Sequence, residues 1–442
     1  MVALWGYGRE GRATHAFLAE RHPGARLTIL NDTPVDDVPA GTECIAGEAG
    51  IAALAEGRFD VVVKSPGISL YRPEIAAAKA KGTVFTSATN LWLEAWPAAF
   101  TVAVTGTKGK STSASLLHHL FGLAGRRSRL LGNVGTAMIA EVPGDDVTVL
   151  ELSSYQIADL EFAPSMALVT NLHPEHGPWH HGHDNYYRDK MRLLTNNPAM
   201  PVAVNATEGR VQQFVQNITS VQFFETPHGF HVRGNALWRG DSPVDVRNLP
   251  LRGRHNWVNL AGAFTVLDMA GAYAPGRTWD FADFTPLPHR LQEMRLANGV
   301  LAVNDSISTI PETTGAALDV HGHAPFRLLL GGVDRGQDYG VLLAHLADMP
   351  TLRQIYLLKG NGEKLAAQVA AAGLPFKGPF VAFDQAVLTA LDDAQAGETL
   401  LPLPRPHPAR RNSPILKSAA NGFGVVWWAE PEACRRPSAG KV

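Results

Sequence analysis

The feature that most constrains this chain is a glycine-rich loop between a predicted β-strand and a predicted α-helix. The strand covers 100–104, the loop reads Thr105-Gly-Thr-Lys-Gly-Lys-Ser-Thr112, and a long helix is expected from Ser111. Backbone N–H groups in such a turn, backed by a helix N-terminus, bind phosphate. The general P-loop pattern has a glycine where this chain has Val104. The loop therefore predicts a phosphate-binding site built on a shortened form of the P-loop motif. The alternative is an ordinary helix N-terminus whose glycines match the motif by chance.

Two side chains of this loop suit ATP and Mg²⁺. Lys110 can reach terminal phosphates, and the Ser111 hydroxyl can bind Mg²⁺. ATP and Mg²⁺ are therefore the expected cofactors. The other candidate ATP contacts in the loop are Gly106, Thr107, Lys108, Gly109 and Thr112.

Strands alternate with helical stretches along the chain, which predicts an α/β protein with parallel, helix-covered sheets. A chain of 442 residues exceeds one ordinary core. We expect a Rossmann-like domain at 1–96, a central ATP-binding domain at 97–287 and a Rossmann-like domain at 288–442, with a linker at 286–290. Strands are expected at 2–5, 27–30, 61–63, 147–150, 166–169, 300–303, 327–330 and 355–358, and helices at 12–21 and from near 251.

A second glycine-rich loop, Gly6-x-Gly8-x-x-Gly11, follows the first predicted strand. In a dinucleotide fold it would hold a pyrophosphate, and Asp32, about twenty residues on, would bind a ribose hydroxyl. The alternative is that the glycines only let a strand and a helix pack closely. A turn at Ser65-Pro-Gly67 follows the strand at 61–63. The pattern favours a nucleotide-like ligand.

Composition excludes several classes of function. Lys and Arg total 39 against 41 Asp and Glu, so there is no general positive field for nucleic acid or an anionic membrane. Two cysteines make neither a disulfide framework nor a cysteine metal site. No basic signal sequence or membrane-length apolar run is visible. We therefore expect a cytoplasmic protein.

Acidic and histidine residues follow the strands of the central segment. Glu151 ends the strand at 147–150, the usual place for a Mg²⁺ ligand beside a phosphate loop. Taken alone, Lys190 would be a solvated helix residue. A histidine-rich stretch matches no zinc spacing, and most of it is expected on a surface loop, with His176 the exception. Its members are His173, His176, His180, His181 and His183.

The run 102–112 resembles the ATP loop of the Mur ligase family. Further motifs follow in the family's order, and Ser65–Ile68 resembles its MurD branch. The likeness extends to about residue 340. Among these motifs, Glu151-Leu-Ser-Ser-Tyr-Gln156 is similar to the family's Glu-Leu-Ser-Ser-Phe-Gln. The motifs are Gly132–Gly135, Glu151–Gln156, Asn171–His176, Tyr187–Lys190, His255–Asn259, Pro288–Arg290 and Asn304–Ser306.

The resemblance assigns catalytic and metal-binding roles. Lys110, Glu151, His176 and Lys190 would be catalytic, and Ser111, Glu151 and His176 would hold Mg²⁺ together with Lys190 as a carbamate. Asn259 and Arg290 would contact adenine and phosphate, and Asp305 the ATP ribose. The family chemistry joins an amino acid to a UDP-linked muramyl precursor through an acyl phosphate.

The resemblance also implies a UDP-substrate site, with UDP-N-acetylmuramoyl-L-alanine and glutamate as small-molecule partners. We expect a monomer that binds neither nucleic acid nor membrane. Asn133 and Ser153 would face the muramyl-alanine arm. The remaining contacts would be Gly6, Gly8, Gly11, Asp32, Thr33, Ser65 and Gly67.

The sequence departs from the MurD pattern where the incoming amino acid would bind. Ile307 replaces a lysine, Thr309 and Arg335 are the candidate amino-acid contacts, and a proline-rich run at 401–411 replaces a pocket motif. This pattern resembles the group that adds L-glutamate, which we predict. D-glutamate addition is the alternative within the class. A P-loop nucleotide switch and a non-catalytic UDP-sugar binder are the alternatives outside it.

Overall fold

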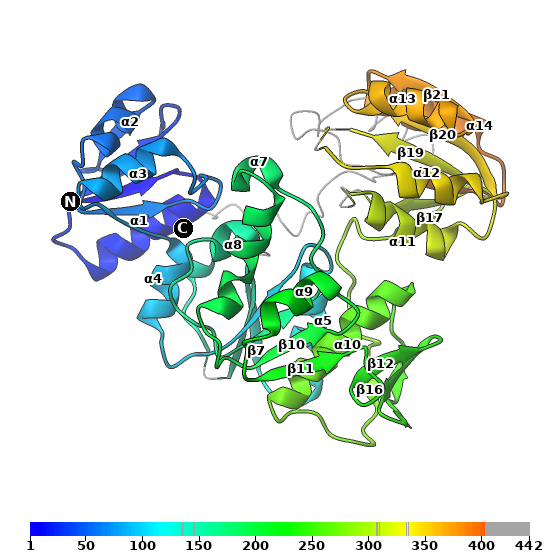
Figure 1. The fold of residues 1–442 in the computed structure, drawn as a ribbon, viewed down its shortest axis with the longest axis horizontal. Helices are drawn as coiled ribbons and strands as arrows, with labels where there is room; N and C mark the ends of the chain where they lie inside the picture. The colour runs from blue at the N-terminus through cyan, green and yellow to red at the C-terminus, as the bar shows by residue number, and fades with distance from the viewer. Residues whose placement is uncertain are drawn as a thin grey trace, which may run out of the picture. The chain divides into compact units, whose positions relative to one another are not determined.

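The computed structural model describes residues 1–133, 137–144, 146–305, 308, 310–332, 334 and 336–402. The chain forms two compact units, Met1–Thr285 and Pro286–Val442, and each is described by itself (Figure 1).

The first sheet of unit 1 is parallel, with strand order β3-β2-β1-β4-β5. The chain winds outward from β1 to β3 and then returns to the other side of β1. This reversal puts a topological switch between β1 and β4, the place where open α/β sheets bind ligands. The loops at Gly6–Gly11 and Ser65–Gly67 follow these two strands. The elements are β1 Val2–Trp5, α1 Arg9–Arg21, β2 Leu27–Asn31, β3 Glu43–Ala46, α2 Glu48–Ala55, β4 Val61–Lys64, α3 Pro73–Ala80, β5 Val84–Thr86 and α4 Ala88–Ala95.

The second sheet of unit 1 is also parallel, in the order β11-β10-β9-β6-β8-β7. Helices cover both faces, so its strands are continuous apolar runs rather than alternating ones. The elements are β6 Phe100–Thr105, α5 Lys110–Leu123, β7 Ser128–Gly132, the 3₁₀ helix Met138–Ala140, β8 Val147–Glu151, α6 Ser154–Ile157, β9 Met166–Val169, α7 Gly177–His180, α8 His183–Thr195, β10 Val202–Asn205, α9 Gly209–Val215, β11 Val221–Phe224 and α10 Arg254–Met269.

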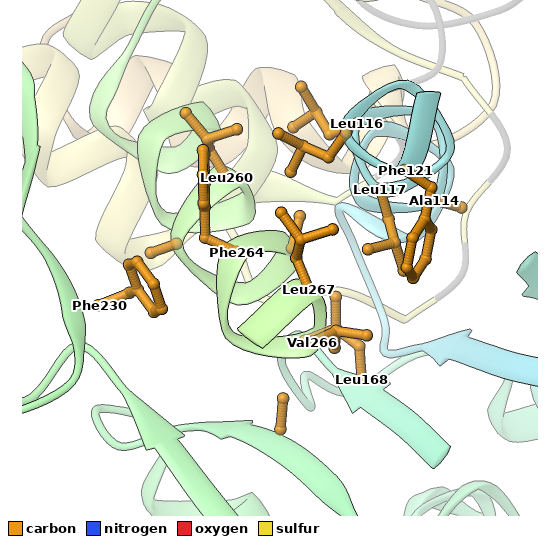
Figure 2. Packing of buried hydrophobic residues seen from close by; sticks show 14 of the residues in the cluster. Ala114, Leu116, Leu117, Phe121, Leu168, Phe230, Leu260, Phe264, Val266 and Leu267 are labelled. Atoms are coloured by element: carbon orange, nitrogen blue, oxygen red, sulfur yellow. The ribbon is translucent and has the colours of Figure 1, made fainter. Parts of the chain in front are cut away.

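Helix α10 packs against α5 on one face of this sheet (Figure 2). Leu116 and Leu117 of α5 meet Leu260 and Phe264 of α10 in one fully buried cluster. On the opposite face, Tyr186 and other residues of α8 belong to a separate cluster. Burying a leucine side chain stabilises a fold by roughly 2 kcal/mol. This packing holds α5, and with it the phosphate loop, in place.

Small sheets that the sequence did not predict extend from this core. An antiparallel sheet has the order β12-β13-β14, and β15 and β16 pair in parallel. The strands are β12 Phe230–Arg233, β13 Ala236–Arg239, β14 Ser242–Pro243, β15 Val246–Arg247 and β16 Trp279–Asp280.

Unit 2 contains a six-stranded sheet in the order β17-β18-β22-β19-β20-β21. Only β17 runs antiparallel, and β22 lies between β18 and β19. The elements are β17 Gln292–Arg295, β18 Leu301–Asn304, α11 Pro311–His321, β19 Phe326–Gly331, α12 Gly340–Ala347, β20 Leu352–Leu358, α13 Gly362–Ala371, β21 Phe376–Phe380, α14 Phe383–Asp393 and β22 Thr399–Pro402.

The predicted α/β class with several parallel sheets is confirmed. Most expected elements are present with shifted ends, such as α10, which begins at Arg254 after Gly253. The three-domain boundaries stay a prediction. Among the described helices, none is long and apolar enough to cross a membrane.

Candidate functional site

Two glycines of the phosphate loop could not be replaced by another residue unless neighbouring atoms moved. Gly106 has φ +142°, and a Cβ there would approach Thr170 Oγ1 to 2.0 Å. Gly109 has φ +83°, and its Cβ would lie 2.4 Å from Asn259 Oδ1. Left-handed backbone favours glycine. Both glycines therefore serve the loop's geometry, and Asn259, a predicted adenine contact, lies directly against the loop.

Buried hydrogen bonds fix the rest of the loop. Thr107 Oγ1 lies 2.7 Å from the Tyr186 hydroxyl and 2.9 Å from the His173 backbone N–H, which donates to it. Asn171 Oδ1 accepts from the Lys108 backbone N–H at 2.8 Å. Lys110 Nζ donates to the Thr107 carbonyl at 2.8 Å. A loop held in this way is pre-organised for a phosphate chain at the N-terminus of α5.

Lys190 of α8 is buried beneath the loop rather than solvated. Its side chain donates to the Gly106 carbonyl at 2.9 Å and lies 3.4 Å from Thr105 Oγ1. Burial, reinforced by the positive charge of Lys110, lowers the pKa of Lys190 well below its ordinary value. Helix periodicity alone would have left Lys190 in solvent, because it does not say which face another element covers; the family resemblance assigned it to the site. A lowered pKa favours the neutral form of a lysine amine, which is its nucleophilic form.

Glu151 ends β8 beside the loop, as predicted. The residue is 1% exposed, and its Oε2 has no hydrogen-bond partner in the described part of the chain. Asn133 Nδ2 donates to the other oxygen, Oε1, at 3.4 Å. An orphaned buried carboxylate oxygen costs free energy unless a ligand satisfies it. The residue is therefore suited to a cation.

Glu175 lies between the loop and His176. Lys108 Nζ donates to Glu175 Oε1 at 2.8 Å, and His176 Nε2 lies 3.5 Å from Oε2. Burial raises the pKa of Glu175, but Lys108, His176 and Lys110 together outweigh it and lower the pKa to about 2. Burial lowers the pKa of His176 to about 4, despite the opposing effect of Glu175. At neutral pH His176 is therefore an uncharged imidazole, the form that binds metals.

The donor set fits Mg²⁺ only when Lys190 is counted as an oxygen ligand. Over the described residues, no group of three or more His, Cys, Asp or Glu side chains could hold a metal. A hydroxyl, a carboxylate and a carbamate from Ser111, Glu151 and Lys190 would supply the hard oxygen atoms that Mg²⁺ prefers. The orphaned Glu151 oxygen is the observation that supports this set.

The expectation that most histidines of the stretch lie on the surface was wrong for His180. Its ring is fully buried, 2.6 Å from Asp189 Oδ2 through Nδ1 and 3.0 Å from Ser154 Oγ through Nε2. Helix α7 is only four residues long, and local periodicity in so short a helix gives no reliable burial pattern. His181 and His183 are exposed, as expected.

The two loops at the switch of the first sheet contact each other. A Cβ at Gly11 would lie 2.2 Å from the Gly6 carbonyl oxygen, and Ser65 Oγ donates to the same oxygen at 2.9 Å. Gly11 therefore serves close packing. Nothing lies within 4 Å of a Cβ added at Gly8 or Gly67, so these glycines leave the loop backbones accessible.

Asp32 and Thr33 follow β2 near these loops. Asp32 is 75% exposed, with Arg72 NH1 at 3.9 Å, and Thr33 is exposed. The Asn31 side chain accepts from the Tyr7 backbone N–H at 3.1 Å and donates to the Thr33 carbonyl at 2.8 Å. Asn31 thus connects the glycine loop to this second loop, a link that sequence reasoning missed.

The remaining predicted residues have structural contacts of their own. Ser153 caps α6 through a capping box with Gln156, and Asn133 lies beside Glu151. In unit 2, Asp305 accepts from the backbone N–H of Leu291, and Arg290 precedes β17. Thr309, Arg335 and Ile307 lie outside the described residues.

The fold and the loop define an α/β protein of the P-loop type. Residues 104–267 match the model of the Mur ligase middle domain. Over 385 residues, 84% of this chain and 82% of the relative, the chain is 38% identical to a protein of Xanthomonas campestris pv. campestris (strain 8004), named UDP-N-acetylmuramoyl-L-alanine–L-glutamate ligase. The chain therefore belongs to the Mur ligase family, and it is an ATP-dependent acid–amino-acid ligase.

Two solved structures show the same fold at low sequence identity. The MurF ligase of Thermotoga maritima, in complex with ADP, has a TM-score of 0.56 at 15% identity and covers 91% of this chain and 90% of its own. The UDP-N-acetylmuramate-alanine ligase MurC of Thermotoga maritima also has a TM-score of 0.56 at 15% identity. The match covers 95% of this chain and 97% of the MurC chain.

Proposed function

We propose that this protein joins L-glutamate to UDP-N-acetylmuramoyl-L-alanine in peptidoglycan precursor synthesis, with hydrolysis of ATP to ADP and phosphate. The observation that carries the proposal is the 38% identity, over 84% of the chain, to a relative named for that reaction. The replaced lysine at Ile307 and the altered tail also favour a changed amino-acid pocket. ATP, UDP-linked precursor and glutamate are cytoplasmic metabolites, so we propose the cytoplasm as its location.

The first step activates a carboxylate that is a poor electrophile. The substrate's alanyl carboxylate attacks the γ-phosphorus of ATP, an acyl phosphate forms and ADP leaves. In this step Lys110 and the N–H groups at the start of α5 hold the phosphate chain and stabilise the negative charge that develops on it. Gly106 and Gly109 let the loop backbone approach the phosphates closely.

The second step forms the amide bond. The amine of glutamate attacks the acyl carbon, the tetrahedral adduct expels phosphate, and the amine loses a proton. We propose that Ser111, Glu151, His176 and a carboxylated Lys190 hold Mg²⁺, which supplies charge neutralisation for the transferred phosphoryl group. The residues of the first sheet, Gly6, Gly8, Gly11, Asp32, Thr33, Ser65 and Gly67, hold the UDP moiety, and Asn133 and Ser153 face the muramyl-alanine arm.

Four residues numbered within unit 2 have proposed substrate contacts of their own. Arg290 and Asp305 contact ATP, and Thr309 and Arg335 bind the incoming glutamate. An arginine can bind a carboxylate through two parallel hydrogen bonds, which a lysine cannot. The proposed organisation keeps three domains, 1–96, 97–287 and 288–442, acting as a monomer.

Phosphate release from ATP tests the proposal. The purified protein is given UDP-N-acetylmuramoyl-L-alanine with L-glutamate, D-glutamate or neither. Release with L-glutamate alone is the expected result. Release with D-glutamate keeps the ligase and refutes the interpretation of Ile307 and the tail. Phosphate release that needs neither substrate would indicate a nucleotide switch. If the folded protein binds ATP but releases no phosphate, it would be a non-catalytic UDP-sugar binder.

A further inference from the structure

Tyr155 of α6 lies between an indole and an imidazole. Its ring stacks on Trp179 with centroids 4.5 Å apart and an interplanar angle of 23°. Its hydroxyl lies 2.8 Å from His176 Nδ1. Both residues belong to the segment that begins α7, with His176 as the N-cap at φ 55°. The tyrosine therefore contacts the predicted metal-binding imidazole through the nitrogen opposite Nε2.

Trp179 in turn is bound to the loop that follows β4. Its indole Nε1 donates to the Gly67 carbonyl at 3.0 Å. In the reverse direction, Ser69 Oγ donates to the Trp179 carbonyl. These reciprocal hydrogen bonds tie α7 to the loop assigned above to the UDP substrate. A continuous series of contacts thus runs from Gly67 through Trp179 and Tyr155 to His176.

A second set of contacts anchors this series. His180, the last residue of α7, is fully buried and bridges Ser154 of α6 and Asp189 of α8. The Tyr71 hydroxyl, from the first sheet's loops, donates to both Asp189 oxygens at 3.2 Å. With α7 fixed against two helices and one loop, Trp179 has little freedom to move away from Tyr155.

The hydroxyl of Tyr155 is what the family's phenylalanine lacks. A phenylalanine can keep the stack on Trp179, but it offers no hydrogen bond to Nδ1. The partner of one imidazole nitrogen selects the tautomer and fixes the ring plane, and so orients the other nitrogen. His176 Nε2 is the nitrogen that remains to face Glu175 and the loop.

We propose that Tyr155 is a positioning residue that orients His176 through Nδ1 and, held by Trp179, couples the substrate loop at Gly67 to that orientation. The inference rests on the proposed function, because it takes Gly67 as a substrate contact and His176 as a metal ligand. It adds a role for two aromatic residues outside the sets proposed above to bind ATP, metal and UDP.

Three variants separate the parts of the coupling. In Tyr155→Phe the stack remains and the hydrogen bond is lost, so kcat falls about tenfold while KM for the UDP substrate stays within twofold, as for loss of an outer-shell partner. In Trp179→Phe a ring remains against Tyr155 but the donor to Gly67 is lost, so KM for the UDP substrate rises at least threefold. In Trp179→Ala both effects occur together.

A double-mutant cycle tests the coupling itself. If Trp179 acts on His176 through Tyr155, adding Trp179→Ala to Tyr155→Phe lowers kcat no further than about twofold. If instead the fold-loss of kcat in the double variant equals the product of the losses in the two single variants, Trp179 and Tyr155 act independently and the coupling is refuted. Tyr273→Phe, in the separate aromatic cluster around Trp279, is the matched control and leaves both constants unchanged.

A readout independent of activity uses ¹⁵N NMR of the histidine side chains, with the His176 signals assigned by their loss in His176→Gln. The Nδ1 resonance is expected to move in Tyr155→Phe and to stay in Tyr273→Phe. An unmoved resonance, or a Tyr155→Phe enzyme with wild-type kcat, overturns the proposal. Should the wild-type protein make no product, the proposed function fails, and the NMR comparison still decides whether Tyr155 orients His176.

Discussion

At the scale of single residues, Lys190 is fully buried, whereas most lysines are exposed to solvent. Burial lowers the pKa of Lys190 and so favours its uncharged amine, which is the form that adds CO₂ to give a carbamate. Replacing Lys190 by methionine, similar in volume, is expected to lower kcat at least 100-fold with little change in ATP affinity. Steady-state kinetics and nucleotide binding measure the two effects.

The carbamate itself can be observed. Wild-type protein equilibrated with ¹³C-bicarbonate is expected to show a carbamate carbonyl resonance that Lys190→Met lacks. Lys108→Met, which removes a half-buried lysine of the neighbouring phosphate loop, is the control and keeps the resonance. A wild-type spectrum without it, in an active enzyme, would contradict carboxylation.

Glu175 predicts a pH-dependent contribution to stability. Its folded pKa, about 2, lies below the ordinary 4.5, so the contribution is complete above pH 4.5 and is lost as pH falls toward 2. Between pH 7 and pH 4 the stability advantage of wild type over Glu175→Gln is expected to shrink by about 1 kcal/mol. Urea unfolding at both pH values measures it, and an advantage that grows on acidification would refute the assignment.

Sequence reasoning found the residues at the ends of strands but not their partners. Lys110, Glu151 and His176 were predicted because motifs and strand ends place them. The Lys108–Glu175 pair joins residues 67 positions apart, and Tyr155 meets Trp179 only because α6 and α7 pack together. Such contacts follow from tertiary packing, which spacing along the chain does not encode. Thr309 and Arg335 stay predictions.

At the scale of elements, α1 packs closely against the turn after β1. A Gly11→Ala methyl group would overlap the Gly6 carbonyl, so we expect a loss of about 1–3 kcal/mol in the free energy of unfolding and a raised KM for the UDP substrate. Gly24→Ala is the control because nothing lies within 4 Å of its added Cβ. Equal stability of the two variants would contradict the packing role.

The central parallel strands β1, β4, β6, β8 and β9 were predicted because helix-covered strands are continuous apolar runs bounded by turns, whereas several outer parallel strands, such as β3, β5, β7 and β11, were missed. The strands β12 to β14 were missed because they are two to four residues long and half-exposed. His180 was expected on a surface loop, and Lys190 was placed in the site by the family resemblance alone, because the sequence does not show which helix faces other elements cover. Periodicity predicts that a face is buried, but only the fold identifies what covers it.

At the scale of the whole molecule, the division after Thr285 predicts that unit 1 is an independent folding unit. A fragment of residues 1–285 contains both parallel sheets of unit 1 and the complete phosphate loop. It is expected to unfold cooperatively, to bind the UDP substrate within about threefold of full-length affinity, and to form no product. Calorimetry and equilibrium binding check this. A fragment without a cooperative transition would show that unit 1 depends on unit 2.

The position of β22 has a consequence for synthesis on the ribosome. Thr399–Pro402 fills the space between β18 and β19, although among the described strands of the sheet it is the last to be translated. Until it emerges, the nascent unit 2 presents two unpaired strand edges in the interior of its future sheet. Such edges invite pairing with other chains. Unit 2 is therefore most prone to aggregate late in translation, before β22 has emerged. Chaperone binding to the nascent chain is expected at that stage.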